Sequence, residues 1–184
     1  MKTQGSYKQL YAETLRDVIK DRVVLKFNPI DTVPDITRRL RASQTKVAGV
    51  VGVHGNLVGM LTENGVMRRI FSRFDNPPPN IERLHNHKAV SRMTAWDVMI
   101  ENPDTLHVDD AVEDALDVMT YLSHSCMPVV DSEKRLIGIV DTGELRRSLE
   151  KKYGALKSLE DPISLYAIQQ KLHDLNFGNS HAYS

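Results

Sequence analysis

The chain has 184 residues, of which 41% are hydrophobic and 26% are charged, a composition typical of a globular protein with one domain or two small ones. Its 24 basic and 24 acidic residues give a formal net charge of zero, which excludes a general attraction to nucleic acid or to an acidic membrane. The single cysteine, Cys126, excludes an intramolecular disulfide and a multi-cysteine metal site. The sequence shows neither the apolar core of a signal peptide nor an apolar run of membrane-spanning length, so we expect a cytoplasmic protein.

The N-terminal part of the chain is expected to be helical. The pattern from Tyr7 to Ile19 is typical of a helix, and residues 1–16 are assigned to an N-terminal helical segment.

An internal repeat organises the residues that follow. When the chain is shifted by 79 residues, residues 26–70 align with residues 105–149 without a gap. The identical pairs include Asp31/Asp110, Val33/Val112, Asp35/Asp114, Val50/Val129, Val51/Val130, Leu57/Leu136, Gly59/Gly138 and Arg68/Arg147. Because polar turns and apolar runs stay in register over 45 residues, we treat the two copies as structural repeats.

Each copy predicts the same order of elements, β-α-β-β-α. A short extended segment and an Asp-containing turn precede a helix, 33–43 or 111–122, which has one apolar face. Two β-branched runs separated by a polar turn predict a hairpin, and a last helix begins at Glu63 or Thr142. A single copy of about 50 residues would be marginally stable. We therefore expect an α/β (α+β) fold in which two pseudo-symmetric copies pack through their sheets.

The repeat defines the expected domains. The first domain is assigned to residues 17–70 and the second to residues 96–150. Residues 71–95 contain Asn-Pro-Pro-Pro-Asn, which cannot continue a helix or a central strand, and are expected to form a connector. Residues 151–184 are expected to form a helical tail, in which the apolar stripe of residues 162–176 either docks on the chain's own core or contacts a second chain or a partner helix.

The second copy resembles the CBS (cystathionine-β-synthase-type) domain pattern. The matching residues are Val98-Met99, Thr105-Leu106, Asp109-Asp110, Met127-Pro128-Val129-Val130-Asp131 and Gly138-Ile139-Val140. The first copy departs from the pattern, with Gly49 in place of the proline and Gly52 in place of the last aspartate. The resemblance implies a stand-alone pair of CBS repeats (a Bateman module) that dimerises through its helices into a disc. It also implies clefts between the repeats, which in this family often bind adenosine-containing ligands.

The residues that the family uses for nucleotides are only partly present. In the family, a Ser or Thr three residues after the glycine of the Gly-Ile pair often contacts phosphate, and an Asp three residues further on holds the ribose. The first copy has the hydroxyl, Thr62, but Gly65 at the acid position. The second copy has an acid, Glu144, but Asp141 at the hydroxyl position. Neither half-site is complete.

Helix capping explains the same residues without a ligand. Thr62 and Asp141 both begin a predicted helix, where Thr and Asp are preferred N-caps, and Asp141 with Glu144 has the spacing of a capping box. A helix N-terminus can also bind phosphate, but an Asp N-cap uses one of its free N–H groups and adds a like charge. We therefore expect any phosphate-bearing ligand to bind by way of Thr62 rather than Asp141.

The candidate site follows from the resemblance and has no catalytic residue and no metal ligand. The candidate ligand-binding residues are Asn28, Lys46, Val47, Ala48, Thr62, Gly65, His107, Ser125, Cys126, Met127, Asp141 and Glu144. Thr62, Arg68 and Arg147 are the candidate phosphate contacts. His107 and His124 are expected to flank the second cleft, where they either stack on a base or serve as structural histidines.

Two functions of different classes remain open. One is a non-catalytic regulatory module that senses AMP, ADP or ATP as a regulatory ligand, requires no cofactor and signals to an unknown regulated protein. The other is a ligand-independent dimerisation or scaffold protein with degenerate nucleotide sites. We expect a homodimer formed through the CBS helices, with neither nucleic acid nor a membrane as partner. An enzyme is not expected, because the sequence shows no nucleophile–base constellation and no Gly-rich phosphate loop.

Overall fold

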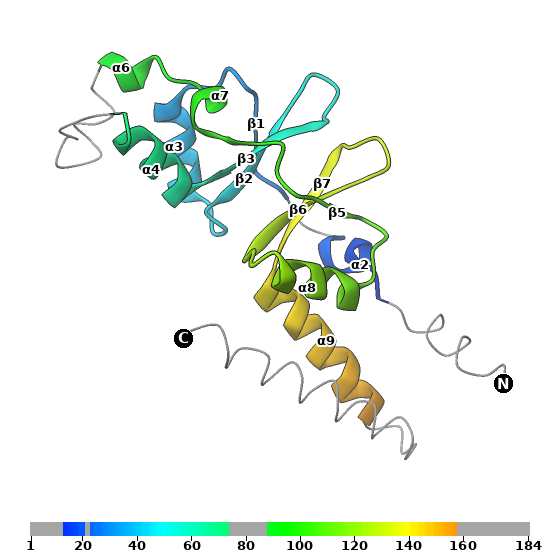
Figure 1. Ribbon diagram of the computed structural model, residues 1–184. Helices are drawn as coiled ribbons and strands as arrows, with labels where there is room; N and C mark the ends of the chain where they lie inside the picture. Colours follow the sequence, from blue (N-terminus) through cyan, green and yellow to red (C-terminus); the bar gives the residue numbers. More distant parts are fainter. Residues whose placement is uncertain (1–12, 21–22, 74–87, 158–184) are drawn as a thin grey trace.

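The computed structural model describes residues 13–20, 23–73 and 88–157. These residues form two small sheets that lie side by side, each with its own helices (Figure 1). The strand order is β1-β2-β3-β4 in one sheet, where β4 (Ile100–Glu101) pairs with β3, and β5-β6-β7 in the other. The expected helix at 162–176 and the Asn-Pro-Pro-Pro-Asn segment lie outside the described residues. None of the helices in the described part of the chain combines the length and the apolar character needed to cross a membrane.

Both copies of the repeat have the predicted order of elements. The elements of the first repeat are β1 (Lys26–Phe27), α3 (Val33–Ala42), β2 (Val47–Val51), β3 (Leu57–Thr62) and α4 (Glu63–Phe71). Those of the second repeat are β5 (Leu106–His107), α8 (Val112–Tyr121), β6 (Cys126–Val130), β7 (Leu136–Asp141) and α9 (Thr142–Lys157). In each repeat the first strand is parallel to the second, and the second and third strands form an antiparallel hairpin. The predicted β-α-β-β-α order is confirmed.

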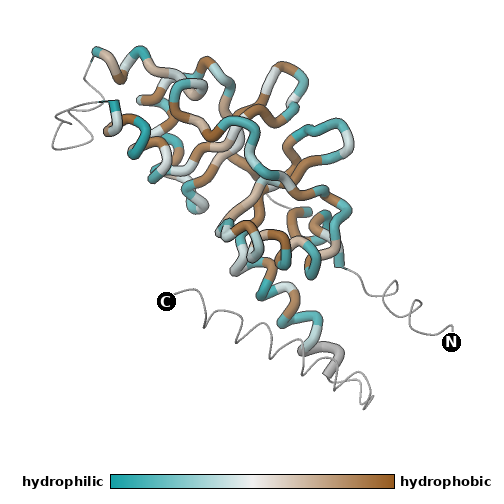
Figure 2. Tube along the Cα trace, viewed as in Figure 1, coloured by the Kyte–Doolittle hydropathy of each residue, from teal (hydrophilic) through white to brown (hydrophobic). Residues whose placement is uncertain are grey.

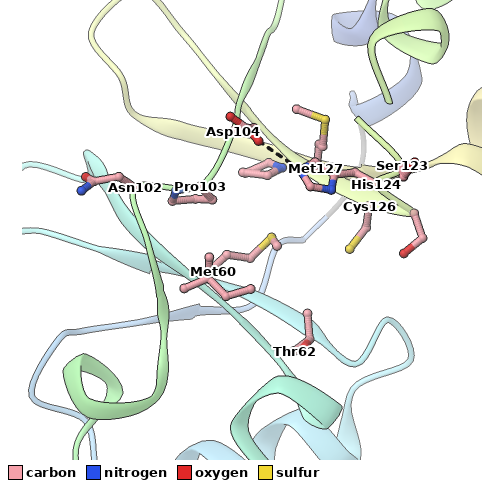
Figure 3. Close-up of a pocket in the computed structure, with 12 residues that line it drawn as sticks. Met60, Thr62, Asn102, Pro103, Asp104, Ser123, His124, Cys126 and Met127 are labelled. Atoms are coloured by element: carbon pink, nitrogen blue, oxygen red, sulfur yellow. Dashed lines mark hydrogen bonds and ion pairs between the residues drawn. The ribbon is translucent and has the colours of Figure 1, made fainter. Parts of the chain in front are cut away.

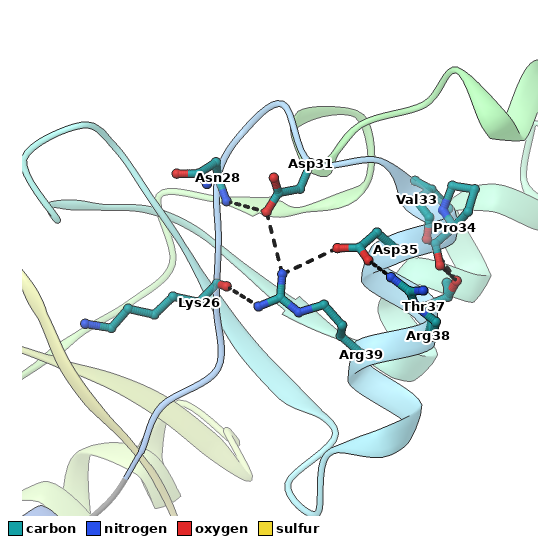
Figure 4. Close-up of polar contacts among 9 residues, drawn as sticks. All are labelled: Lys26, Asn28, Asp31, Val33, Pro34, Asp35, Thr37, Arg38 and Arg39. Carbon is teal, nitrogen blue, oxygen red and sulfur yellow. Dashed lines mark hydrogen bonds and ion pairs between the residues drawn. The ribbon is translucent and has the colours of Figure 1, made fainter.

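The repeated aspartate closes the turn between the first strand and the first helix. The carboxylate of Asp31 accepts a hydrogen bond from the backbone N–H of Asn28 at 2.9 Å, and Asp110 accepts one from His107 at 2.6 Å. Figure 4 shows the first of these turns, where Arg39 of α3 also approaches Asp31 and donates to the carbonyl of Lys26 at 3.1 Å. An Asp side chain that bonds the backbone in this way favours a turn over a continued strand, which explains why Asp occurs at both positions.

The first helix of each repeat buries the face that its spacing predicts. Val33, Ile36 and Leu40 of α3 are fully buried, and so are Val112 and Met119 of α8. Each such side chain contributes roughly 1.5–3 kcal/mol when it leaves water. Figure 2 shows the hydrophobic residues along the strands and the helix faces that meet them, whereas the outer turn of the β6–β7 hairpin is hydrophilic.

The short helix before each repeat packs on the other repeat. The helix α2 (Leu15–Ile19) precedes the first repeat, but Leu15 and Ile19 belong to the hydrophobic core of the second. The helix α7 (Ala95–Val98) precedes the second repeat, but its buried residues belong to the core of the first. We call the first repeat with α6 (Lys88–Ser91) and α7 the first body, and the second repeat with α2 the second body.

Identical capping motifs start the two exchanged helices. Thr14 precedes α2, and its backbone N–H and its hydroxyl donate to the carboxylate of Asp17. Thr94 donates to Asp97 in the same way before α7. The backbone N–H of Leu15 donates to the carbonyl of Asp110, and that of Ala95 donates to the carbonyl of Asp31. Both exchanged helices are therefore held in the same way at the Asp turn of the other repeat.

The glycine in the last strand of each repeat makes room for the exchanged lead-in. A Cβ atom at Gly138 would lie 2.8 Å from Cδ1 of Ile19, and one at Gly59 would lie 2.3 Å from Sδ of Met99. Real Cβ atoms do not approach so closely. Ile19 and Met99 end the segments that contain α2 and α7, so these glycines are required by the exchange.

The two bodies meet through their hairpins. The backbone N–H of Leu57 donates to the carbonyl of Lys134, and that of Leu136 donates to the carbonyl of Gly55. Nζ of Lys26 donates to the carbonyl of Leu136 at 2.9 Å, and Gly49 faces the same leucine side chain. The expected packing of the repeats through their sheets is thus found as contact between two separate sheets.

Three expectations about boundaries differ from the structure. The described helix that ends at Ile19 begins at Leu15, because Thr14 caps it, and not at Tyr7. The helix α9 runs through residue 150 and continues to Lys157. Residues 88–95, expected to belong to the connector, contain α6 and pack on the first body through Val90, Met93 and Ala95.

Candidate functional site

The first cleft lies where the end of β3 approaches the start of β6, and it has a volume of about 360 Å³. Met60 and Thr62 come from the first repeat, and the other lining residues come from the lead-in and the hairpin of the second repeat. These are Ile100, Asn102, Pro103, Asp104, Ser123, His124, Ser125, Cys126, Met127 and Pro128. Figure 3 shows Thr62 and Asp104 on opposite sides of this cleft.

The second cleft, of about 350 Å³, is the pseudo-symmetric counterpart of the first. It lies where the end of β7 approaches the start of β2. Its lining comprises Thr45, Val47, Ser125, Cys126, Ile139, Val140, Asp141, Thr142 and Glu144. Ile139 and Asp141 correspond to Met60 and Thr62 in the repeat, so each cleft joins the last strand of one copy to the first hairpin strand of the other.

The two clefts present different groups at the equivalent helix N-termini. The hydroxyl of Thr62 accepts the backbone N–H of Gly65 at 3.0 Å. A hydroxyl that accepts this bond keeps its own proton for donation to a ligand. Asp141 accepts the N–H of Glu144 at 2.9 Å, and its own N–H donates to the Glu144 carboxylate at 3.2 Å, which confirms the predicted capping box. An ionised carboxylate has no proton to donate.

The charges of the linings also differ. In the first cleft, Nε2 of His124 lies 3.0 Å from the carboxylate of Asp104, which is the one carboxylate of the described lining. The described lining of the second cleft contains two carboxylates, Asp141 and Glu144, and no cationic side chain. The second cleft is therefore the less favourable of the two for an anion.

Cys126 lines both clefts but is not an activated thiol. Burial, together with the nearby charge of Asp141, raises the pKa of Cys126 above its ordinary value. Nucleophilic cysteines have a lowered pKa. The thiol therefore serves as a small apolar wall, as expected from its position at the start of a strand.

The structure brings together about half of the residues predicted for the site. Thr62, Ser125, Cys126 and Met127 line the first cleft, and Val47, Asp141 and Glu144 line the second.

The remaining predicted residues lie outside the lining of both clefts. Ala48 is fully buried in the first core, and Gly65 donates to the cap of its own helix. The others on this list are Asn28 and His107, whose N–H groups bond the turn aspartates, Lys46, and the exposed side chains of Arg68 and Arg147.

The residues missed by sequence analysis come mainly from the lead-in of the second repeat. Ile100, Asn102, Pro103 and Asp104 form one wall of the first cleft. The repeat itself carried a signal for this wall, because Thr14-x-x-Asp17-Val18 recurs as Thr94-x-x-Asp97-Val98 before it. His124, expected beside the second cleft, lines the first.

Comparison with known proteins identifies the family. The CBS domain family matches residues 95–151. A CBS domain-containing protein of Dictyostelium discoideum is 30% identical over 119 residues, which cover 63% of this chain and 78% of that protein. The chain belongs to the CBS domain family. The CBS domain-containing protein CBSCBSPB1 of Arabidopsis thaliana is 28% identical over 149 residues, but the chain spans only 25% of its length.

Solved CBS structures have the same fold. The structure of CBSX2 in complex with AMP matches with a TM-score of 0.57 at 22% identity, and the match covers 75% of this chain and 96% of that one. The CBS domain pair of protein MJ0100, in complex with 5-methylthioadenosine and S-adenosyl-L-methionine, matches with a TM-score of 0.56 at 20% identity and covers 77% and 98%. The chain is therefore a pair of CBS repeats.

Proposed function

We propose that this CBS pair is a non-catalytic regulatory module that binds an adenosine-containing ligand, of the AMP, ADP or ATP class, in the first cleft. The observation that carries the proposal is the lining of that cleft, which comes from both bodies. The second cleft has the equivalent position in the repeat, but its lining has two carboxylates where that of the first has one. The ligands in the CBSX2 and MJ0100 structures support an adenosine compound as the class.

The chemistry of the first cleft suits a nucleotide. The Thr62 hydroxyl sits at the N-terminus of α4, where it can donate to a phosphate and where the helix dipole favours negative charge. On the opposite side, the carboxylate of Asp104 can accept hydrogen bonds from a ribose diol. Met60 and Ile100 provide apolar surface for a base. Asp104 would thus supply the acid that Gly65 does not.

The second cleft is proposed to reject phosphate. A phosphate placed about 4 Å from the Asp141 carboxylate is repelled by roughly 4 kcal/mol at the dielectric of a protein surface, which corresponds to about a thousandfold in affinity. An uncharged or cationic adenosine compound would not meet this repulsion.

Calorimetry with AMP and ATP tests the assignment. We expect no more than one nucleotide per chain, loss of binding in Thr62→Asp, and unchanged or additional binding in Asp141→Thr. Thr62→Ser, which retains the capping hydroxyl, is the matched control and should bind. Unchanged binding in Thr62→Asp together with loss in Asp141→Ala would reverse the assignment.

The module is further proposed to act as a homodimer formed through its helices, which signals to a regulated protein. Exposed apolar side chains at the C-terminal end of α8, namely Val118, Tyr121 and the C-cap residue Leu122, support a contact there. Light scattering on a sizing column should give about twice 20.8 kDa. A dimer that binds none of AMP, ADP, ATP, 5-methylthioadenosine or S-adenosylmethionine would favour the scaffold function. The incomplete ligand motifs of both repeats support that alternative.

A further inference from the structure

The formal net charge of the whole chain is zero, but the two bodies carry net charges of opposite sign. In the first body, to which Met99 and the β3-paired strand β4 also belong, residues 23–73 and 88–101 hold ten basic and five acidic residues, a net charge of +5. In the second body, residues 13–20 and 102–157 hold nine basic and thirteen acidic residues, a net charge of −4. The exchange of α2 and α7 assigns each helix to its body, so the difference follows from the fold and not from the order of the sequence.

The helices of the two repeats also differ in charge. Together α3 and α4 have five basic and two acidic residues. The helix α8 has three acidic residues and no basic one, and α9 has five basic and two acidic residues. The first repeat therefore presents a net charge of +3 on its helices. In the second repeat the −3 of α8, which also carries exposed apolar residues, is separate from the +3 of α9, and the two helices sum to zero.

Several of these charges have no side-chain partner among the described residues. Arg38 and Arg39 pair with Asp35, and Glu113 pairs with Lys152 of α9. By contrast, no hydrogen bond or ion pair among the described residues engages the guanidinium group of Arg68 or Arg69 of α4. The same holds for the carboxylates of Asp114 and Asp117 of α8 in the described part of the chain. All four side chains are exposed. Unpaired charges of opposite sign on the two helical faces are complementary to one another and not to themselves.

We propose that the homodimer is antiparallel, so that the helices α3 and α4 of one chain face α8 of the second chain. This inference rests on the proposed homodimer and adds its orientation. In a parallel dimer, α8 would face its own copy and bring Asp114 and Asp117 of both chains together, and the two first bodies, each with a net charge of +5, would also meet. Like charges placed across an interface disfavour that arrangement, and complementary charges favour the antiparallel one both in the encounter and in the complex.

The sign of the charge effect distinguishes the two orientations. Arg68→Gln/Arg69→Gln and Asp114→Asn/Asp117→Asn each remove charges that attract in the antiparallel dimer and repel in the parallel one. Four exposed pairs per dimer predict a weakening of about 30-fold for either double variant, which corresponds to about 2 kcal/mol. The charge-retaining controls Arg68→Lys/Arg69→Lys and Asp114→Glu/Asp117→Glu should dimerise like the native chain. Added NaCl should weaken the native dimer.

Interchain distances give an independent readout of the orientation. Chains in a Cys126→Ala background carry one spin label, at Arg69→Cys or at Asp117→Cys, and are measured singly and as an equimolar mixture. We expect the shortest interchain distance to appear only in the mixture, between label 69 and label 117. A dimer in which each labelled chain gives a short distance with its own copy, or which tightens on neutral substitution or with salt, overturns the orientation but leaves the homodimer intact. A monomer by light scattering overturns both, and calorimetry on the Thr62 variants tests ligand binding separately.

Discussion

Gly138 is the position at which one added methyl group tests the exchange of the lead-in helices. A Cβ at this residue would lie 2.8 Å from Cδ1, 3.0 Å from Cγ2 and 3.2 Å from Cβ of Ile19. Ile19 is only 5% exposed and is fixed in the second core by α2, so neither side can move away freely. We expect Gly138→Ala to lower the free energy of unfolding by about 1–3 kcal/mol, the usual cost of overpacking.

A double-mutant cycle isolates the contact. Ile19→Ala alone removes a buried side chain and should cost about 2–5 kcal/mol. In the double variant the new methyl group occupies the space that Ile19 leaves. The double variant should therefore lose at least about 1 kcal/mol less stability than the sum of the two single losses. Urea denaturation measures all three free energies.

The equivalent glycine of the other repeat is the matched control. Gly59→Ala meets Met99 and not Ile19, so its combination with Ile19→Ala should be additive to within about 0.5 kcal/mol. If the Gly138 pair is also additive to that precision, α2 does not dock on the second repeat and the exchange is refuted.

Two further predictions concern acid stability and the indivisibility of the fold. Burial disfavours the charge of Glu113, but hydrogen bonds from Lys152 and Tyr153 outweigh it and hold its pKa below the ordinary 4.5. Its contribution to stability is therefore present above that pH and is lost as the pH falls through the lowered pKa, so melting temperatures between pH 7 and 3 should fall less steeply for Glu113→Gln than for the native chain. Cutting the chain within residues 77–79 should leave neither half folded, because α2 and α7 would each be separated from the core they complete; a well-dispersed amide spectrum from either half alone would contradict this.

The local elements could be predicted because each of them depends on short-range chemistry. The Asp turns, the apolar faces of α3 and α8, the hairpins and the caps at Thr62 and Asp141 all follow from residues a few positions apart. Register within each hairpin followed from the repeat, since Val50 pairs with Gly59 as Val129 pairs with Gly138.

The partner of each lead-in helix could not be predicted in the same way. The apolar residues Leu15 and Ala95 show that a helix is buried, but burial alone does not indicate which of two similar cores receives it. The prediction of the candidate site was wrong in part for the same reason. Predictions made one repeat at a time placed Asn28 and His107 at the clefts, whereas the clefts are built across the repeats and use Asp104 instead.

The exchange of α2 and α7 also changes how the two bodies are tied together. Of the described residues, α2 lies on the second body, the chain from Leu25 lies on the first, and it returns to the second between residues 101 and 105. Both α4 and α6 belong to the first body. The returning segment is a covalent tether between the bodies, and its residues 102–104 form a wall of the first cleft with Ile100 of β4. A molecule bound in that cleft would contact both bodies and the segment that links them, so that ligand binding would be coupled to the angle between the bodies.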